Sequence, residues 1–155
     1  MDRPPSHQDA ELILRLYELR REPRMRQARD WFATSFNAET REELDLLCAQ
    51  GSEENTSFRM VVGYWDMAAS FIVNGILHRE LFFESGWEML LCWEKIHRLV
   101  PVLREQSKNR TLFRNLQEVG EAYVDWLNAR SPDFYEAYSQ AVGALGMEEA
   151  AGEEV

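Results

Sequence analysis

The sequence predicts an all-α protein, an antiparallel helical bundle of about six or seven helices with three long helices at its core. Apolar residues between Phe58 and Ile72 recur every three or four positions, as they do on the wide buried face of a helix. Two later runs, Phe82–Leu103 and Leu112–Trp126, follow heptad spacing, which is typical of packed helices. No segment shows the alternation of apolar and polar residues that indicates a strand.

The first two helices are expected before residue 37. Residues 9–21 carry an apolar stripe of leucines at helical spacing, namely Leu12, Leu16 and Leu19. Pro23 breaks this pattern and suits the first turn of a second helix, because proline lacks the N–H that is unsatisfied there anyway. The second helix is expected to end at about Phe36.

A short helix and a long central helix are expected next. Thr40 and Glu43 have the spacing of a capping box, in which each side chain satisfies a free backbone N–H at the helix start. Gly51 would end this short helix, since glycine readily adopts the left-handed conformation of a C-terminal stop. The central helix is predicted over 53–74, followed by a second glycine stop at Gly75.

The longest helix is predicted over 78–106. Its heptad seam consists of Phe82, Gly86, Met89, Trp93, Ile96, Val100 and Leu103. Pro101 removes one hydrogen bond of the helix and clashes with the preceding turn, so the prediction includes a kink near His97.

Two further helices complete the expected bundle. Asn109 is a candidate cap for the helix that carries the second heptad run. Ser131 followed by Pro132 indicates the start of a last helix, expected to end at about Leu145. The chain is long enough for one core, so the expected organisation is a flexible N-terminus over 1–8, a single domain over 9–145 and an acidic flexible tail over 146–155.

The formal charge of −10 argues against nucleic acid as a partner, because phosphate backbones require concentrated basic side chains. The two cysteines, Cys48 and Cys92, lie in apolar surroundings and predict buried thiols in a reducing compartment. The start of the chain is polar, and the longest uncharged run, 67–77, is too short to cross a bilayer. We therefore expect a cytoplasmic protein that does not bind membranes.

One stretch departs from the acidic character of the chain. Residues 1–30 carry seven arginines and six acidic residues, and most of these arginines crowd the segment Arg20–Arg29. The simpler interpretation is a solvated helix surface on which the arginines alternate with acids. The alternative is a patch that binds an acidic protein partner or the acidic remainder of a second copy.

Polar residues also recur at helical spacing inside the most apolar helix, at Arg59, Asp66, Ser70 and Asn74. These residues could form the solvent edge of the central helix. Alternatively, Asp66 is at least partly buried and pairs with Arg98 or Arg104, because an unpaired buried carboxylate costs several kcal/mol.

Signals for catalysis are weak. Glu94 and His97 have the Glu-x-x-His spacing of di-iron bundles, but His7 and His78 lack a glutamate three residues earlier, so the second half of such a site is missing. We therefore predict no metal and no cofactor, and expect Glu94 and His97 to be a surface pair near the kink. No phosphate-binding loop or nucleophile elbow is present in the sequence.

The stretch from Val62 to Arg104 resembles a bacterial family of small helical proteins classed as a domain of unknown function, number forty-seven sixty. The matching elements are Tyr64–Trp65–Asp66, Asn74–Gly75, Trp93, and Pro101 with Arg104. Some members carry an N-terminal hydrophobic helix that this chain lacks. The family has no assigned activity, so the resemblance implies a helical fold and favours an ion pair between Asp66 and Arg104.

The predicted function is that of a homo-oligomeric interaction or regulatory module rather than an enzyme. An aromatic-rich acidic bundle that leaves an apolar stripe exposed is expected to self-associate. The alternative is a bundle that binds a small ligand in an aromatic pocket, whose candidate residues are Asp66, Tyr64, Trp65, Trp93 and Arg104.

Overall fold

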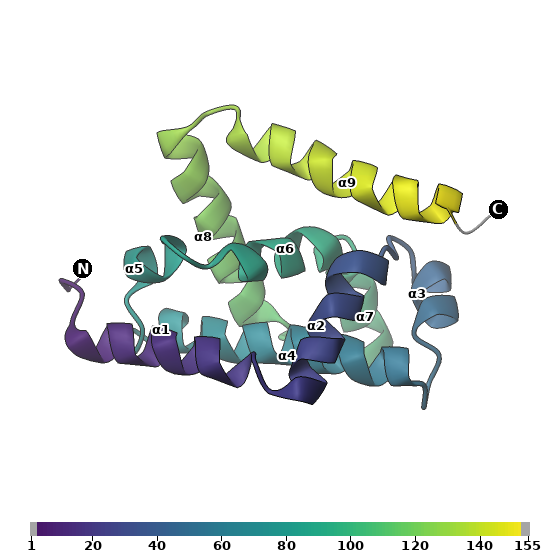
Figure 1. Cartoon of the computed structure of the whole chain (residues 1–155), viewed down its shortest axis with the longest axis horizontal. Coiled ribbons are helices and arrows are strands. Elements are labelled where there is room, and N and C mark those ends of the chain that lie inside the picture. Colours follow the sequence, from purple (N-terminus) through teal and green to yellow (C-terminus); the bar gives the residue numbers. More distant parts are fainter. Residues whose placement is uncertain (1–2, 153–155) are drawn as a thin grey trace.

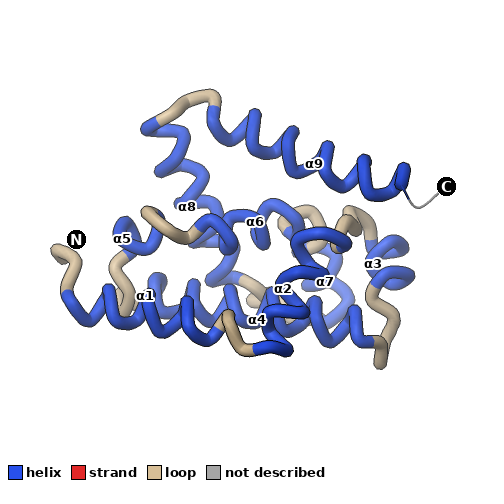
Figure 2. The backbone as a smooth tube through the Cα atoms, viewed as in Figure 1, coloured by secondary structure: helices blue, strands red, loops and turns tan. Residues whose placement is uncertain are grey.

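The computed structural model describes the backbone of residues 3–152 and the side chains of residues 3–145. Over that range the chain forms nine helices and no strand, which confirms the all-α prediction (Figure 2). The helices are α1 (His7–Leu19), α2 (Pro23–Ser35), α3 (Arg41–Leu47), α4 (Glu53–Val73), α5 (Arg79–Phe83), α6 (Trp87–Ile96), α7 (Val100–Ser107), α8 (Arg114–Arg130) and α9 (Phe134–Gly152).

The central helix α4 has nearly the bounds that the sequence predicts. The Ser52 hydroxyl accepts a hydrogen bond from the Asn55 N–H at 3.1 Å and so caps its first turn. Asn74 ends the helix, and Gly75 follows with a φ of +72°, a left-handed conformation that glycine adopts without strain. Both sequence signals at the C-terminal end are therefore confirmed.

The predicted capping box at the start of α3 forms only in part. The Thr40 hydroxyl accepts a hydrogen bond from the Glu43 N–H at 3.2 Å, as expected. The Glu43 carboxylate, however, binds the N–H of Glu39 at 2.8 Å rather than that of Thr40. This contact holds the end of the α2–α3 loop against α3.

The prediction of a single long helix over 78–106 is wrong, because that stretch forms the three helices α5, α6 and α7. The first break lies at Gly86, where an added Cβ would come within 2.5 Å of the Phe82 ring. The second break precedes Pro101, which lies in the first turn of α7 instead of kinking a continuous helix. The large apolar residues of the seam are nevertheless buried, including Phe82, Met89 and Ile96.

The last two helices start later than predicted. The Asn109 side chain caps a turn by accepting the Thr111 N–H at 3.0 Å, and α8 begins only at Arg114. Helix α9 begins at Phe134 and continues to Gly152, seven residues beyond the predicted end at Leu145. The predicted flexible tail thus overlaps α9 up to Gly152, and residues 153–155 lie outside the described part of the chain.

The N-terminal segment makes specific contacts from Arg3 onward. Both Arg3 Nη atoms donate to the Asp9 carboxylate at 2.6 Å, and Arg3 also donates to the Ile76 carbonyl at 3.0 Å. Asp9 in turn accepts the His78 N–H at 2.8 Å. The described part of the N-terminal segment, which the sequence predicts to be flexible, is therefore hydrogen-bonded to the turn between α4 and α5. Helix α1 already begins at His7, inside the segment predicted to be flexible.

Helix α4 packs mainly against α2 and α8 and forms the centre of the core. Figure 1 shows α1 and α4 extended along the long axis of the molecule, α8 crossing that direction steeply, and α9 returning above them toward α3. None of the helices in residues 3–152 combines the length and apolar character needed to span a bilayer.

Candidate functional site

Asp66 caps a neighbouring helix. Its Oδ1 accepts a hydrogen bond from the Leu116 N–H at 3.1 Å, in the first turn of α8. Phe113, at the start of α8, has no side-chain capping hydrogen bond and adopts a φ of +57°. The carboxylate of α4 therefore satisfies one of the free N–H groups at the positive end of the α8 dipole.

The alternative pairing of Asp66 with Arg98 or Arg104 does not form among the described residues. Arg98 forms an ion pair with Glu39 at 2.7 Å, and the Nε of Arg104 donates to the Leu112 carbonyl at 2.8 Å. Asp66 and Arg104 thus both bind the backbone between Leu112 and Leu116, which fixes the loop before α8 from two sides. The reason is geometric, because the free amides at the α8 start offer the carboxylate fixed partners in the tertiary fold.

The other polar residues on the Asp66 side of α4 serve their own helix. The Ser70 hydroxyl donates to the Met67 carbonyl at 2.5 Å, and the Asn74 amide donates to the Ser70 carbonyl at 2.8 Å. Arg59 is exposed. Within the described residues, Asp66 is therefore the one member of this polar row that is hydrogen-bonded to another element, and Arg59 and Asn74 lie exposed on α4.

Tyr64 and Trp65 pack into the core on the α1 side. The Tyr64 hydroxyl donates to the Leu16 carbonyl, and burial raises the pKa of this phenol to about 12. Trp65 is buried against the rings of Tyr64 and Phe82, and the Arg20 guanidinium lies 5.2 Å from its ring centroid.

Trp93 fills the crossing between α6 and α8. Its ring lies against the backbone of Gly120, where an added Cβ would overlap the ring, and it contacts the His97 ring at a centroid distance of 5.8 Å. Neither Trp93 nor Trp65 lines either of the cavities identified below, and the ligand-binding role of these two residues stays a prediction.

The arginines of the segment Arg20–Arg29 are largely used within the molecule. Arg20 and Arg29 both form ion pairs with Glu88 of α6, the latter at 2.7 Å. Arg29 also donates to the Arg20 carbonyl at 2.9 Å, and Arg24 donates to the Ser57 hydroxyl at 3.2 Å. Arg21 and Arg26 remain exposed and are the part of this segment accessible to a partner.

Glu94 is buried rather than part of a surface pair, which corrects the sequence-based interpretation. Only 6% of Glu94 is exposed, and its two oxygens accept hydrogen bonds from Tyr135 at 2.5 Å and from Ser139 at 2.6 Å. Burial, together with the hydrogen bond to Glu94, raises the pKa of the Tyr135 phenol above its usual range. The carboxylate thereby holds α9 against α6 through charge-assisted hydrogen bonds.

His97 lies near Glu94 but is oriented into the protein. Its Nε2 is buried and accepts or donates no hydrogen bond among the described residues. Burial lowers the pKa of His97, while the nearby Glu94 charge acts in the opposite direction. The His97 ring packs against the Trp93 ring. Among the side chains of residues 3–145, no group of three or more His, Cys, Asp or Glu could hold a metal ion.

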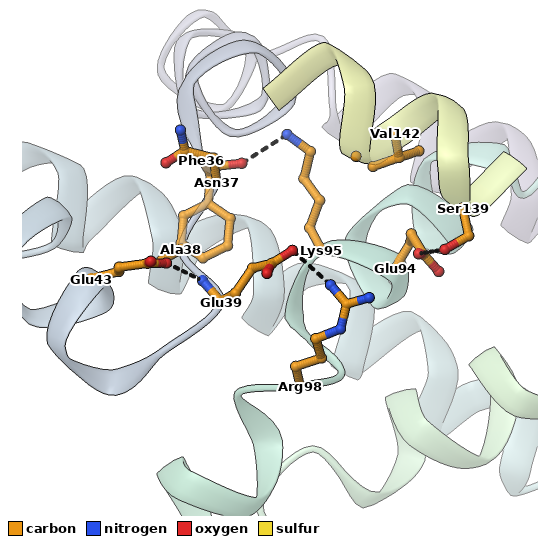
Figure 3. Close-up of a pocket in the computed structure, with 11 residues that line it drawn as sticks. Phe36, Asn37, Ala38, Glu39, Glu43, Glu94, Lys95, Arg98, Ser139 and Val142 are labelled. Carbon is orange, nitrogen blue, oxygen red and sulfur yellow. Dashed lines mark hydrogen bonds and ion pairs between the residues drawn. The ribbon is translucent and has the colours of Figure 1, made fainter. Parts of the chain in front are cut away.

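A groove lies between α9, the end of α6 and the loop that joins α2 to α3 (Figure 3). We call it the α9 groove. It encloses a cavity of about 320 Å³. Its lining residues are Phe36, Asn37, Ala38, Glu39, Glu43, Glu94, Lys95, Arg98, Ser139, Val142 and Gly143.

The base of the α9 groove is rigidly built. The Lys95 ammonium donates to three carbonyls at the C-terminal end of α2, those of Phe32, Ala33 and Phe36, at 2.8–3.0 Å. A cation at this position complements the negative end of the α2 dipole. Glu94 and Ser139 close the opposite side, so the groove walls come from three elements that are held together by hydrogen bonds.

The rim of the α9 groove carries more exposed charges. The Nη1 atom of Arg98 lies 2.7 Å from Oε1 of Glu39, and 54% and 61% of these two side chains are exposed (Figure 3). A second cavity of about 660 Å³ lies on the other side of Glu39, lined in part by Arg41, Glu105 and Lys108. The α2–α3 loop therefore separates two hollows on this surface.

Sequence reasoning missed the α9 groove because its residues are far apart in the chain. One signal was available, since Glu94 is an acid inside the apolar run from Met89 to Ile96. Tyr135 and Ser139, spaced by one helical turn, are the matching polar pair on α9. Nothing in the sequence indicates that these three residues meet.

Comparison with known proteins places the chain in a family. Residues 5–140 match the family described as a domain of unknown function, DUF4760. No curated protein and no solved structure shows a significant match to the chain. Because the match covers α1 to α8 and the first turns of α9, including every residue of the predicted site, this chain belongs to the DUF4760 family.

Proposed function

We propose that this protein is an interaction module that self-associates through the exposed face of α1. The observation that carries the proposal is a pair of large apolar side chains on that helix, Leu14 and Tyr17, which are 62% and 52% exposed. Together with Ala10 they occupy one helical stripe, because positions 10, 14 and 17 are spaced by one turn. Exposed apolar stripes on soluble proteins mark sites of association.

The distribution of charge supports a second copy as the occupant of this stripe. The chain carries a formal charge of −10, so two copies repel each other over most of their surfaces. Residues 1–30 are the exception, with seven arginines against six acids. The stripe itself is bordered by exposed side chains of both signs, which include Glu11, Arg15 and Glu18. The border of the stripe therefore offers charges of both signs to a second copy, rather than acids alone.

The position of α1 is compatible with such an interface. Helix α1 runs along one long edge of the molecule in Figure 1. Its opposite face is anchored by the buried Leu16 and by the hydrogen bond from Tyr64 to the Leu16 carbonyl. Because α1 is held in place on its inner side, its exposed face can pair with the same face of a second copy about a two-fold axis. A symmetric dimer uses the same patch twice.

Sedimentation velocity over a range of protein concentrations tests the proposal. We expect the unaltered chain to dimerise and the double variant Leu14→Glu/Tyr17→Glu to raise the dissociation constant at least about tenfold, because charged side chains would be buried at the interface. The matched control is Leu46→Glu on α3, where an 85% exposed leucine lies outside the stripe. A monomer at every concentration, or a double variant that associates like the control, would contradict the proposal.

A further inference from the structure

The α9 groove presents charged groups of both signs on facing walls. Arg98 at the end of α6 uses one Nη atom for Glu39, and within residues 3–145 its other N–H groups have no acceptor. On the opposite wall, Glu39 and Glu43 belong to the α2–α3 loop and the start of α3. A molecule in the groove would therefore meet free donors on one side and carboxylate acceptors on the other.

The carboxylates on this wall have free acceptor capacity. Oε2 of Glu43 accepts the Glu39 N–H at 2.8 Å, and Oε1 of Glu39 accepts the Arg98 guanidinium. Each carboxylate has a second oxygen that receives no hydrogen bond from the described residues. An ammonium group has three N–H donors, which match several carboxylate oxygens at once.

Most of the remaining lining is apolar or already hydrogen-bonded, and Asn37 is the polar exception among the described residues. Phe36 and Ala38 are buried residues of the α2–α3 loop itself, and Val142 and Gly143 of α9 also line the cavity. Both oxygens of Glu94, on the α9 side of the groove, accept hydrogen bonds from hydroxyls of α9. The inner part of the groove thus suits an apolar group, whereas ionic recognition is restricted to the rim.

We propose that the α9 groove binds a small zwitterion, a free α-amino acid with an apolar side chain. Its carboxylate lies against Arg98, its ammonium group lies between Glu39 and Glu43, and its side chain packs against Val142 of α9. A cavity of about 320 Å³ has the size for a molecule of this class, at the lower end of the range for small-ligand sites.

The ion pair between Arg98 and Glu39 does not prevent this binding. Both side chains are more than half exposed, and pairs of that kind contribute little to stability. The zwitterion replaces this ion pair, because its carboxylate binds Arg98 and its ammonium group binds Glu39. An anion alone would leave Glu39 and Glu43 without a positive partner, and a cation alone would leave Arg98 without a negative one. This site is separate from the α1 stripe, so the two proposals stand or fall independently.

Isothermal titration calorimetry on the full chain tests the proposal with alanine, valine, leucine, methionine and phenylalanine as probes. We expect at least one of these amino acids to bind. We expect its two truncated analogues, the acid without the amine and the amine without the carboxylate, to bind at least tenfold more weakly. Absence of binding by all five amino acids at millimolar concentration overturns the proposal, as does equal binding of either analogue.

Variants locate the binding site. Arg98→Gln is expected to weaken binding of the amino acid at least tenfold, and Glu43→Gln to weaken it in the same direction. The matched control is Arg110→Gln, which removes an exposed arginine outside the α9 groove. Circular dichroism checks that each variant is folded. Binding that is unchanged by Arg98→Gln, or reduced equally by the control, places any bound amino acid elsewhere and contradicts the proposal.

Discussion

At the scale of single residues, the carboxylates of Asp66 and Glu94 each join one helix to another without an arginine. Asp66 accepts a backbone N–H of α8, and Glu94 accepts the hydroxyls of Tyr135 and Ser139. In both cases the carboxylate comes from one helix and its donors from another. A charged acceptor forms stronger hydrogen bonds than a neutral one, so each acid fixes the position of the helix that it contacts.

The capping role of Asp66 leads to a prediction for the variant Asp66→Ala. We expect a loss of about 1 kcal/mol in the free energy of unfolding, within the range of about 0.5–2 kcal/mol for the loss of a helix N-cap. Urea denaturation monitored by circular dichroism measures this loss. The control is Asp125→Ala, which removes an exposed acid of α8 and is expected to change stability by less than about 0.5 kcal/mol.

Two outcomes would contradict the capping role of Asp66. A loss of more than about 3 kcal/mol would indicate a buried charge pair. Equal stability of the Asp66→Ala and Asp125→Ala variants would indicate a residue at the solvent edge.

At the scale of secondary structure elements, the contact between α6 and α8 depends on one glycine. Gly120 lies in α8 and lets the Trp93 ring of α6 approach the α8 backbone directly. Trp93 in turn is 6% exposed and contacts His97. A large side chain against a residue without a Cβ is a way to bring two helices close together without leaving a void.

The variant Gly120→Ala tests this contact. We expect a loss of roughly 1–3 kcal/mol in the free energy of unfolding, because the added methyl group overlaps the ring and forces Trp93 or α8 to shift. The control is Gly63→Ala in α4, where an added Cβ has no neighbour within 4 Å. That change is expected to be neutral or to stabilise the helix by up to about 1 kcal/mol.

A double-mutant cycle identifies the cause of the loss. In the background Trp93→Leu, the substitution Gly120→Ala is expected to cost less than in the unaltered chain, since the smaller side chain leaves room for the methyl group. An identical cost in both backgrounds would show that the Trp93 ring is not the obstacle.

At the scale of the whole molecule, a cluster of contacts around Asp9 joins the start of the chain to the turn between α4 and α5. Asp9 is 1% exposed and accepts hydrogen bonds from Arg3, from Ser6 and from the His78 N–H. The Arg3 guanidinium, followed by the hydrogen bonds from Ser6 and His78, holds the pKa of Asp9 far below its usual range. Residues separated by 69 positions are thereby linked through one charged side chain.

The lowered pKa predicts a pH-dependent contribution of Asp9 to stability. The unfolded chain binds a proton at Asp9 near pH 4, whereas the folded protein does so only at much lower pH. The stabilising contribution is therefore complete above about pH 4 and is lost as the pH falls toward the folded pKa.

The variant Asp9→Asn is expected to lower the unfolding temperature at pH 7. The difference from the unaltered chain is expected to narrow between about pH 4 and pH 2, where the unaltered chain loses the same charge in its unfolded state. Differential scanning calorimetry over this range measures both effects, with the exposed Asp30→Asn as control. A difference that stays constant down to pH 2 would show that the charge of Asp9 is not the stabilising feature.

Most of the helices could be predicted from local patterns. Helix α4 has its expected bounds because both of its ends are encoded nearby, by Ser52 and by Asn74 with Gly75. The break at Gly86 was missed because the heptad seam continues through it, and burial of Phe82 and Met89 gives the same apolar spacing whether or not the helix is continuous. The spacing of apolar residues predicts which side chains are buried, but it does not predict where the backbone changes direction.

The candidate site could be predicted less well. The sequence singled out Asp66 as a polar residue in an apolar helix, and this acid does join α4 to another element. Its partner could not be predicted, because the free amides at the start of α8 depend on where the loop after α7 places that helix. The α9 groove combines residues from three separate segments of the chain, and no local pattern relates them.

The sequence by itself determined the all-α class, the buried faces of the helices and most of the capping signals, because these depend on residues within one or two turns of each other. Only the tertiary structure decided which elements meet. It turned Asp66 toward an amide rather than an arginine, buried Glu94 beneath α9, bound Arg20 and Arg29 to Glu88, and left Leu14 and Tyr17 exposed on α1. The physical reason is that a charged group takes the partner that the packed helices bring within hydrogen-bonding distance.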